Sequence, residues 1–270
     1  MKRGVPLQPP PSVARPRPGF PARLETSAAA PRATPPVAAR GRVVAPLARP
    51  AVPSGVGMDS QAVRTALVRK IEAQGVSHAG VLAALRAVER HRFVDTALVN
   101  QAYEDTSLPI GLGQTISKPG VVARMIELLC QGRPEKLGRV LEIGTGCGYQ
   151  AAVLSHVARE VYSIERLKGL HEKARENLRP FRLSNLHLLF GDGMLGYARG
   201  APYAGIIAAA GGNDIPDAWI DQLAVGGRLV APAVTGAGRQ NLVVVEKTAT
   251  GVVRTELEAV MFVPLKSGIA

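Results

Sequence analysis

Hydrophobic residues recur with helical spacing where the chain first shows a regular pattern. Val63, Leu67 and Ile71 are four residues apart, so they share one face of a helix that Asp59 or Ser60 can cap. Similar spacing predicts two further helices, over residues 78–89 and 119–130.

After residue 139, short apolar runs alternate with helical segments. The runs predict strands at 139–143, 160–165, 186–190, 205–210, 227–233, 241–247 and 258–264, with helices at 149–158, 167–182 and 215–224. Nearly continuous apolar strands that alternate with helices indicate a parallel sheet covered on both faces. The last two strands are close in sequence, with Gly251 between them, and we expect an antiparallel hairpin.

These patterns predict an α/β protein. The sheet is expected to be doubly wound and Rossmann-like, mostly parallel with an antiparallel C-terminal hairpin, and preceded by an N-terminal helical segment. We expect a domain over 58–270, with N-terminal helices and a substrate loop in 58–135 and a cofactor-binding core in 136–270.

The first 57 residues have a different composition. They contain 13 of the 21 prolines, nine basic residues and one acid, so they carry eight of the twelve net positive charges. Proline at this density blocks helices and strand ladders, and the aliphatic residues are too scattered to form a core. We expect a disordered extension.

Several roles are open for this extension. Its charge could bind nucleic acid or anionic lipid, and an Arg-rich, acid-poor start is also found in organelle transit peptides. The favoured interpretations are a solvated extension or a start codon assigned too far upstream. A protein that only binds nucleic acid would need aromatics among its basic residues. Phe20 is the one aromatic in the extension, so nucleic acid is not expected as a partner.

The chain has two cysteines, Cys130 and Cys147, and neither belongs to a CxxC pair. This argues against a disulfide scaffold or a zinc site and fits a reducing, cytoplasmic location. No apolar run reaches the roughly 18 residues of a membrane span, so no membrane association is expected.

A glycine-rich loop follows the first predicted strand. Residues 144–148 read Gly-Thr-Gly-Cys-Gly, and helical spacing resumes directly afterwards. Glycines let the backbone bend sharply and approach a ligand, and the free N–H groups of the helix N-terminus favour anionic or polar atoms. This loop suits a nucleotide-like cofactor.

Two acids at later strand ends narrow the choice of cofactor. Glu165 lies 21 residues after Gly144, where a carboxylate can accept both ribose hydroxyls of either NAD or S-adenosylmethionine. Asp192 ends the next strand, where it could meet an adenine amino group. With the Gly-x-Gly-x-Gly spacing, this pattern resembles class I S-adenosylmethionine-dependent methyltransferases. The resemblance implies cofactor contacts from Gly113, Gln114, Thr115, Gly144, Thr145, Gly146, Gly148, Glu165, Arg166, Asp192 and Gly193.

An irregular stretch, residues 93–117, precedes the cofactor half and ends in Gly113-Gln114-Thr115-Ile116-Ser117. Loops this long in a compact domain are usually functional. This segment, together with 90–94, 102–105, 108–111, 141–150, 221–230 and 262–265, resembles the protein-L-isoaspartate O-methyltransferases over residues 60–265. The resemblance implies S-adenosylmethionine-dependent methyl esterification of the free carboxyl of L-isoaspartyl residues in damaged proteins and peptides, which is a protein-repair reaction.

The resemblance assigns the catalytic role to Ser117. A substrate carboxylate is already ionised at neutral pH, so the reaction needs orientation and exclusion of water but no general base. A hydroxyl that orients the carboxylate suffices, with Gln114 and Thr115 shaping the same loop. Ser117 could instead cap the helix that begins at Pro119, and both roles can coexist. The histidines at 91, 156, 171 and 187 are scattered, and we expect core or surface roles for them.

The chain departs from the family pattern at two places. Residues 208–212 read Ala-Ala-Ala-Gly-Gly where the family usually has Thr-Ala-Ala-Pro, and Ala204 replaces an acid. Both changes are expected near the floor of the substrate site. The alternative function is a class I methyltransferase for RNA or a small molecule. The sequence at 210–213 lacks the Asn/Asp-Pro-Pro-Tyr/Phe turn of amine-methylating enzymes.

Overall fold

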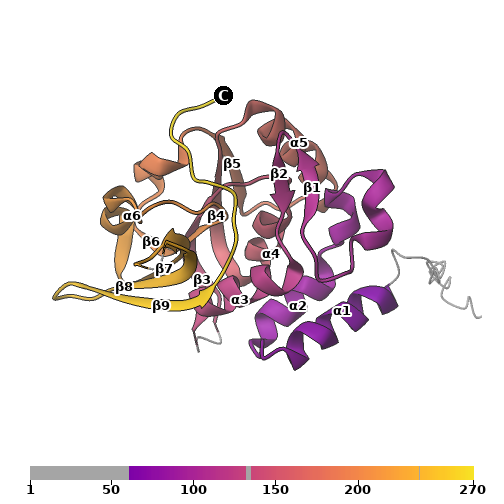
Figure 1. Cartoon of the computed structure of the whole chain (residues 1–270), viewed down its shortest axis with the longest axis horizontal. Coiled ribbons are helices and arrows are strands. Elements are labelled where there is room, and N and C mark those ends of the chain that lie inside the picture. Colours follow the sequence, from indigo (N-terminus) through magenta and orange to yellow (C-terminus); the bar gives the residue numbers. More distant parts are fainter. Residues whose placement is uncertain (1–60, 132–134, 237) are drawn as a thin grey trace, which may run out of the picture. The chain divides into compact units, whose positions relative to one another are not determined.

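The computed structural model describes residues 61–131, 135–236 and 238–270 (Figure 1). The extension predicted at 1–57 and the helix cap predicted at Asp59 or Ser60 lie outside the described residues. The domain boundary at residue 58 stays a prediction for the same reason.

Three helices form from the apolar periodicity of the N-terminal segment: α1 (Gln61–Ala73), α2 (Ala79–Ala87) and α3 (Pro119–Cys130). Leu67 and Ile71 on α1 are buried as expected. Helix α2 begins where the His78 side chain accepts a hydrogen bond from Val81 N at 3.3 Å. Two short 3₁₀ helices, η1 (Arg90–Phe93) and η2 (Thr96–Gln101), lead from α2 toward the loop.

The stretch expected to be irregular contains a small antiparallel hairpin. It consists of β1 (Leu108–Gly111) and β2 (Gln114–Ile116), with Leu108 opposite Ile116. The turn places Gly111, Leu112 and Gly113 at positive φ, which glycine adopts readily. Strands of three or four residues are too short to show alternation in a sequence window, so the pattern could not predict them.

The main sheet has seven strands in the order β5-β4-β3-β6-β7-β8-β9. Strands β3 to β7 pair in parallel and β8 and β9 pair antiparallel, so the predicted fold class is confirmed. The chain runs outward from β3 to β5 and returns on the other side at β6, which makes the carboxyl ends of β3 and β6 the topological switch point. The bounds are β3 (Leu137–Ile143), β4 (Ala158–Glu165), β5 (Leu186–Phe190), β6 (Tyr203–Ala208), β7 (Leu223–Val234), β8 (Gln240–Lys247) and β9 (Val252–Ala259).

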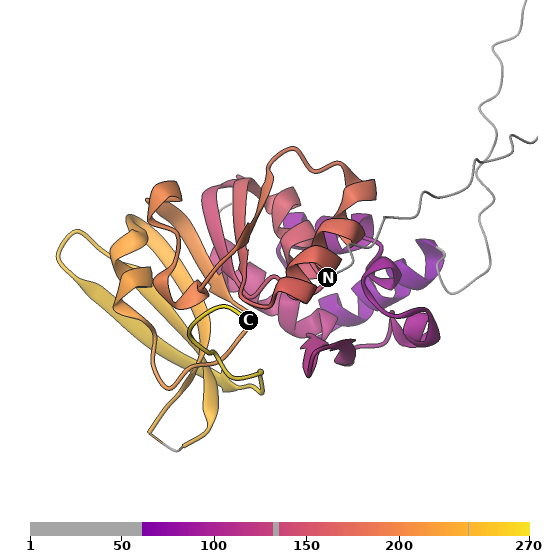
Figure 2. The same ribbon diagram turned by 90° about the horizontal axis from the view of Figure 1, so that it is seen from above.

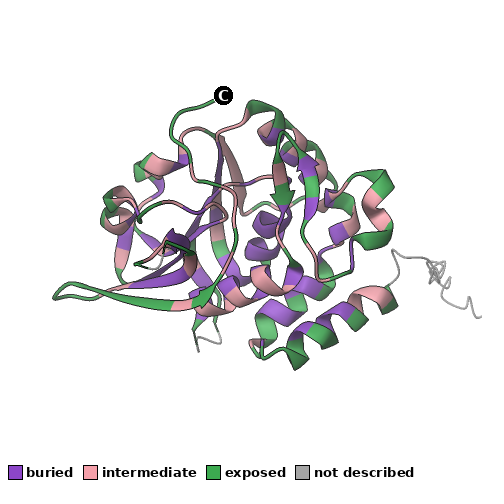
Figure 3. Ribbon diagram, in the orientation of Figure 1, coloured by how far each residue is buried: buried purple, intermediate pink, exposed green. Residues whose placement is uncertain are grey.

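Helices cover the sheet, and its central strands are the most deeply buried part of the domain (Figures 2 and 3). One apolar core includes residues of α1 to α5, and a second gathers around Trp219 of α6. The helices of the cofactor half are α4 (Tyr149–Val157), α5 (Lys168–Leu178) and α6 (Asp217–Gln222), with 3₁₀ helices η3 (Arg179–Phe181), η4 (Gly193–Leu195) and η5 (Ala198–Gly200).

The prediction of the last strand at 258–264 was wrong. The hairpin is antiparallel as expected, but its second strand, β9, spans Val252–Ala259. Because β9 is largely exposed, its sequence is polar and contains no apolar run that would predict a strand. Residues 260–265 form an extended segment that crosses the carboxyl edge of the sheet. They are attached there through Gly211, whose N–H donates to Val263 O at 2.9 Å. This crossing brings the C-terminus beside the residues that follow β4 and β5.

Candidate active site

The glycine loop turns sharply at the carboxyl end of β3. Gly144, Gly146 and Gly148 have φ angles of 90°, 57° and 94°, which residues with a Cβ rarely adopt. The N–H groups of Gly144 and Thr145 both donate to Ile164 O, at 2.9 and 3.1 Å. The loop is therefore fixed to β4 and exposes its backbone to the cavity above the sheet.

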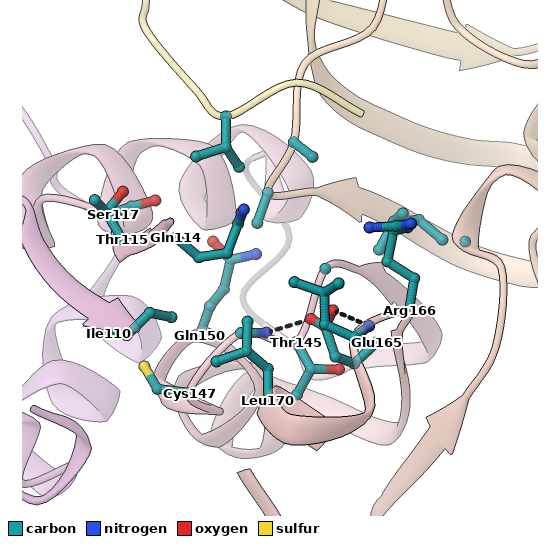
Figure 4. A pocket seen from close by; sticks show the side chains of 18 of the residues that line it. Ile110, Gln114, Thr115, Ser117, Thr145, Cys147, Gln150, Glu165, Arg166 and Leu170 are labelled. Atoms are coloured by element: carbon teal, nitrogen blue, oxygen red, sulfur yellow. Dashed lines mark hydrogen bonds between the residues drawn. The ribbon is translucent and has the colours of Figure 1, made fainter. Parts of the chain in front are cut away.

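The Glu165 carboxylate ties the end of β4 to this loop (Figure 4). One of its oxygens accepts a hydrogen bond from Gly146 N and the other from Leu167 N, each at 2.9 Å. Glu165 is only 4% exposed, yet it lines the cavity. A carboxylate oxygen has two lone pairs, so each oxygen can accept one further donor, such as one of two neighbouring ribose hydroxyls.

A buried polar chain supports the loop from below. Ser163 Oγ bonds to the Glu142 carboxyl and lies 2.6 Å from Thr145 Oγ1. Burial raises the pKa of Glu142 to about 8, so this carboxyl is mostly protonated at neutral pH. Glu142 Oε1 and Gln150 Nε2 are buried without a hydrogen bond of normal geometry in the described part of the chain.

These features fit S-adenosylmethionine. The amino-acid end of that cofactor carries a carboxylate acceptor, which matches the donor Gln150 Nε2; Glu142 is fully buried and does not line the cavity. Gln150 lines the cavity between Glu165 and Ser117 (Figure 4). Gln150 closes the glycine motif, but its position in the sequence did not indicate a role for it.

The segment that carries Ser117 forms the opposite wall of the cavity. Gln114, Thr115 and Ser117 lie on that side, facing Glu165 and Arg166 (Figure 4). The capping role considered for Ser117 is wrong, because the N-cap residue of α3 is Lys118. Asp105 Oδ1 instead accepts from Gly120 N at 2.8 Å. The Ser117 hydroxyl is therefore not used by the helix.

Arg90 holds this wall in place. Its side chain is 1% exposed and donates to the carbonyl oxygens of Ala102, Thr106 and Ser117, at 2.8, 3.0 and 3.0 Å. Burial lowers the pKa of Arg90. The guanidinium carbon also lies 5.1 Å from the centre of the Tyr149 ring, in the first turn after the glycine loop. Arg90 thus links the Ser117 segment to the cofactor half, a role that the sequence pattern did not indicate.

The C-terminal residues close one side of the cavity. Residues 263–266 line it, and Arg166 Nε donates to Gly268 O at 2.8 Å. Arg166 O in turn accepts from Ala270 N at 2.9 Å. Asp192 Oδ2 accepts from Gly268 N at 2.6 Å. Sequence spacing did not indicate these hydrogen bonds, because each joins residues that are 76 or more positions apart.

The structure brings most of the predicted site residues together. Those that line the cavity are Gln114, Thr115, Ser117, Gly144, Thr145, Gly146, Glu165, Arg166 and Gly193. Gly113 lies in the β1–β2 turn. A Cβ at Gly148 would lie 2.7 Å from Leu178 Cδ1, so this glycine permits close packing on α5. The Asp192 side chain bonds to backbone N–H groups of Met194 and Gly268. The cofactor contacts of all the predicted site residues stay predictions.

The two departures from the family pattern lie at opposite ends of β6. Ala209 and Ala210 line the cavity, as expected for its floor. Ala204 does not line it and lies at the amino end of the strand, where a Cβ at Gly138 would be 3.3 Å from the Ala204 Cβ. The expectation that Ala204 lies near the substrate site was wrong, because strand polarity puts that end of β6 far from the switch point.

The Gly211 departure replaces a proline by a residue with an N–H group. That N–H donates to Val263 O at 2.9 Å, and a Cβ at Gly211 would lie 2.6 Å from Gln240 Nε2. The Gln240 side chain also accepts from Phe262 N at 2.8 Å. Gly211 therefore allows the floor of the site to bond directly to the C-terminal segment.

We expect Gly211→Pro to destabilise the domain. It removes a hydrogen bond and crowds Gln240, at a cost of roughly 1–3 kcal/mol, so Tm should fall by roughly 3–10 °C in thermal unfolding. Gly236→Ala is a suitable control, since a Cβ there meets nothing within 4 Å. An unchanged Tm for Gly211→Pro would show that this bond contributes little.

The described residues include no helix long and apolar enough to cross a membrane. They also contain no cluster of His, Cys, Asp and Glu side chains suited to a metal ion. Two of the scattered histidines bond to neighbouring side chains instead, His91 to the Tyr103 hydroxyl at 2.7 Å and His187 to Glu160 at 3.1 Å.

Comparisons with known proteins identify the family of this chain. The family model described as protein-L-isoaspartate(D-aspartate) O-methyltransferase matches residues 62–270. A protein-L-isoaspartate O-methyltransferase of Methylibium petroleiphilum is 63% identical over 219 residues, which are 80% of this chain and 81% of that protein. One of Ralstonia nicotianae is 57% identical over 227 residues, 78% of this chain and 71% of the other.

Solved structures give the same result. A protein-L-isoaspartate O-methyltransferase structure superposes with a TM-score of 0.69 at 28% identity, covering 76% of this chain and 67% of its own. A Plasmodium falciparum structure, titled a putative member in complex with S-adenosyl-L-homocysteine, has the same fold, with a TM-score of 0.65 at 22% identity and coverage of 75% and 98%. The chain therefore belongs to the protein-L-isoaspartate(D-aspartate) O-methyltransferase family.

Proposed function

We propose that this protein transfers a methyl group from S-adenosylmethionine to the free carboxyl of L-isoaspartyl residues in damaged proteins and peptides. The observation that supports this most is the position of Ser117. Its hydroxyl lies in a wall of the same cavity that holds the glycine loop and Glu165, and no helix cap uses it. A carboxylate acceptor and a nucleotide-like donor can therefore meet in one place.

The donor end of the site is built for binding and orientation. Glu165 would hold the ribose hydroxyls, the glycine loop would let the cofactor lie against the backbone, and Gln150 would hold the amino-acid end. When bound, S-adenosylmethionine supplies an electrophilic methyl group, and the bond between sulfur and that carbon breaks as the bond to the carboxylate oxygen forms. The products are a methyl ester and S-adenosylhomocysteine.

The acceptor end needs no proton transfer. The isoaspartyl carboxyl is ionised at neutral pH, so the Ser117 hydroxyl need only donate a hydrogen bond and orient one oxygen toward the methyl carbon. Among the described cavity residues, Glu165 is the only carboxylate, and its oxygens bond to Gly146 N–H and Leu167 N–H at the cofactor end, so it is not placed to act as a base on the acceptor. Apolar side chains such as Ile110 and Leu170 exclude water from the site.

The substrates are proteins and peptides that contain isoaspartyl residues, and we place the reaction in the cytoplasm. Cys130 and Cys147 are both buried free thiols, which fits a reducing compartment. Burial raises the pKa of the Cys147 thiol to about 11, so it is not a nucleophile in this cavity.

The test is methyl transfer to a flexible peptide that contains either L-isoaspartate or L-aspartate at one position. The isoaspartyl peptide should react at least about a hundredfold faster, because a misplacement of about 1 Å can cost that factor. Ser117→Ala should lower kcat by a similar factor and leave the Kd of S-adenosylhomocysteine within about twofold, with Ser117→Thr as the variant that retains a hydroxyl. Equal rates for both peptides would contradict the repair function but leave a general class I methyltransferase.

A further inference from the structure

A second hollow opens directly beside the cofactor cavity. It shares Thr115, Ser117, Ala209 and Val263 with that cavity and has a volume of about 580 Å³. We call it the outer groove; its other lining residues are Ser107, Lys118, Val121, Arg239, Gln240, Ala259, Val260, Met261 and Phe262. Because Ser117 borders both spaces, a peptide whose carboxylate reaches Ser117 would extend its neighbouring residues into the outer groove.

Among the described residues, the outer groove is lined by positively charged side chains and by no acidic ones. Lys118 and Arg239 are its two cationic lining residues, and its lining includes no acid. Both side chains are exposed, and neither forms a hydrogen bond or ion pair with any residue in the described part of the chain. The basic residue Arg124, by contrast, is paired with Glu127 and with Glu258 at 3.4 and 3.1 Å. Glu258 is thus engaged elsewhere, although it adjoins the groove in sequence.

The backbone of each cationic residue is held by a helix or by a hydrogen bond. Lys118 occupies the N-cap position of α3, directly after Ser117. Arg239 lies in the turn between β7 and β8, where its carbonyl accepts from Thr235 N at 3.1 Å. In Figures 1 and 2 this turn and the β1–β2 hairpin lie on either side of the extended C-terminal segment. The N-terminus of α3 adds further positive potential beside Lys118.

We propose that the outer groove selects isoaspartyl peptides that carry an acidic side chain close to the isoaspartyl residue, and that Lys118 and Arg239 determine this specificity. The inference rests on the proposed function and names the class of substrate within it. An extended peptide advances roughly 3.3 Å per residue, so the acidic side chain should lie within about three residues of the reacting one. Basic side chains at the same positions should be disfavoured by repulsion.

The size of the effect follows from the exposure of both cations. An exposed ion pair contributes roughly 0.2–1 kcal/mol, so two cations together favour an acidic peptide over a neutral one by about fivefold. Repulsion of a basic peptide should lower its kcat/KM by about a further twofold. The ratio of kcat/KM between acidic and basic peptides should therefore be about tenfold or more. Salt should reduce this ratio, because exposed charges are screened.

The experiment uses one neutral isoaspartyl host peptide with Glu, Gln or Lys at single positions on either side of the isoaspartyl residue. The wild-type protein should prefer Glu over Lys on at least one side. The double variant Lys118→Gln/Arg239→Gln should bring the Glu-to-Lys ratio of kcat/KM close to one, and Lys118→Glu/Arg239→Glu should invert it. A ratio within each variant cancels any general loss of activity.

The matched control is Arg159→Gln/Arg199→Gln. It removes the same charge from two exposed arginines near the amino ends of β4 and β6, away from the groove. This control should keep the wild-type ratio. Equal kcat/KM for Glu and Lys peptides in the wild type, or an equal fall of the ratio in the control, would overturn the proposal while isoaspartyl methylation stands. Failure to methylate any peptide would instead overturn the proposed function and this inference with it.

Discussion

Replacement of Glu165 by alanine is expected to weaken the binding of S-adenosylhomocysteine by at least about a hundredfold. The substitution removes the acceptor proposed for the ribose hydroxyls, and it also leaves the N–H groups of Gly146 and Leu167 without their partner. Hydrogen bonds to charged groups contribute roughly 1.5–3 kcal/mol each, so the loss of two accounts for that factor. Isothermal titration calorimetry measures it directly.

Two further variants sharpen this prediction. Glu165→Gln retains one acceptor oxygen but turns an NH₂ group toward a backbone donor, so its affinity should lie near that of the alanine variant. Glu176→Ala, on the exposed side of α5, should leave the affinity unchanged. A Kd for Glu165→Ala within about threefold of the wild-type value would show that Glu165 does not hold the cofactor.

Replacement of Arg90 by methionine is expected to lower the free energy of unfolding by about 3–5 kcal/mol and to reduce kcat in the fraction that remains folded. The substitution leaves the carbonyl oxygens of Ala102, Thr106 and Ser117 unpaired in a buried position. The Ser117 carbonyl then loses its anchor, so its hydroxyl no longer holds one orientation.

Urea unfolding and methyl transfer at low temperature separate the two effects. Arg92→Met is the control, since Arg92 lies two residues away, is exposed and pairs with Glu89 at the surface. Arg90→Lys should have a stability between those of the wild type and Arg90→Met. An ammonium group cannot reach three separate carbonyls as the forked guanidinium does. Normal stability and normal kcat in Arg90→Met would contradict the anchoring role.

The sequence by itself determined the central architecture and the donor half of the site. Most strands from 137 to 247 contain runs of buried residues, so they appear as apolar runs that a window of a few residues detects; β5, at the edge of the sheet, is only partly buried. The glycine loop and Glu165 are likewise local features, because a backbone at positive φ favours glycine and because Glu165 directly follows an apolar run. Their approach to one another follows from parallel pairing of β3 and β4, which the alternation of strands and helices implies.

Only the tertiary structure decided the acceptor half. The β1–β2 hairpin, the three carbonyls on Arg90 and the crossing of residues 260–265 depend on contacts between segments far apart in the chain. β9 is largely exposed and polar, so no apolar run predicted its position. Hydrophobic periodicity reports which face of a segment is buried, but it does not report which partner covers that face. The positions of the side chains around Ser117 depend on the segments that pack against them. Their arrangement is therefore known only from the folded domain.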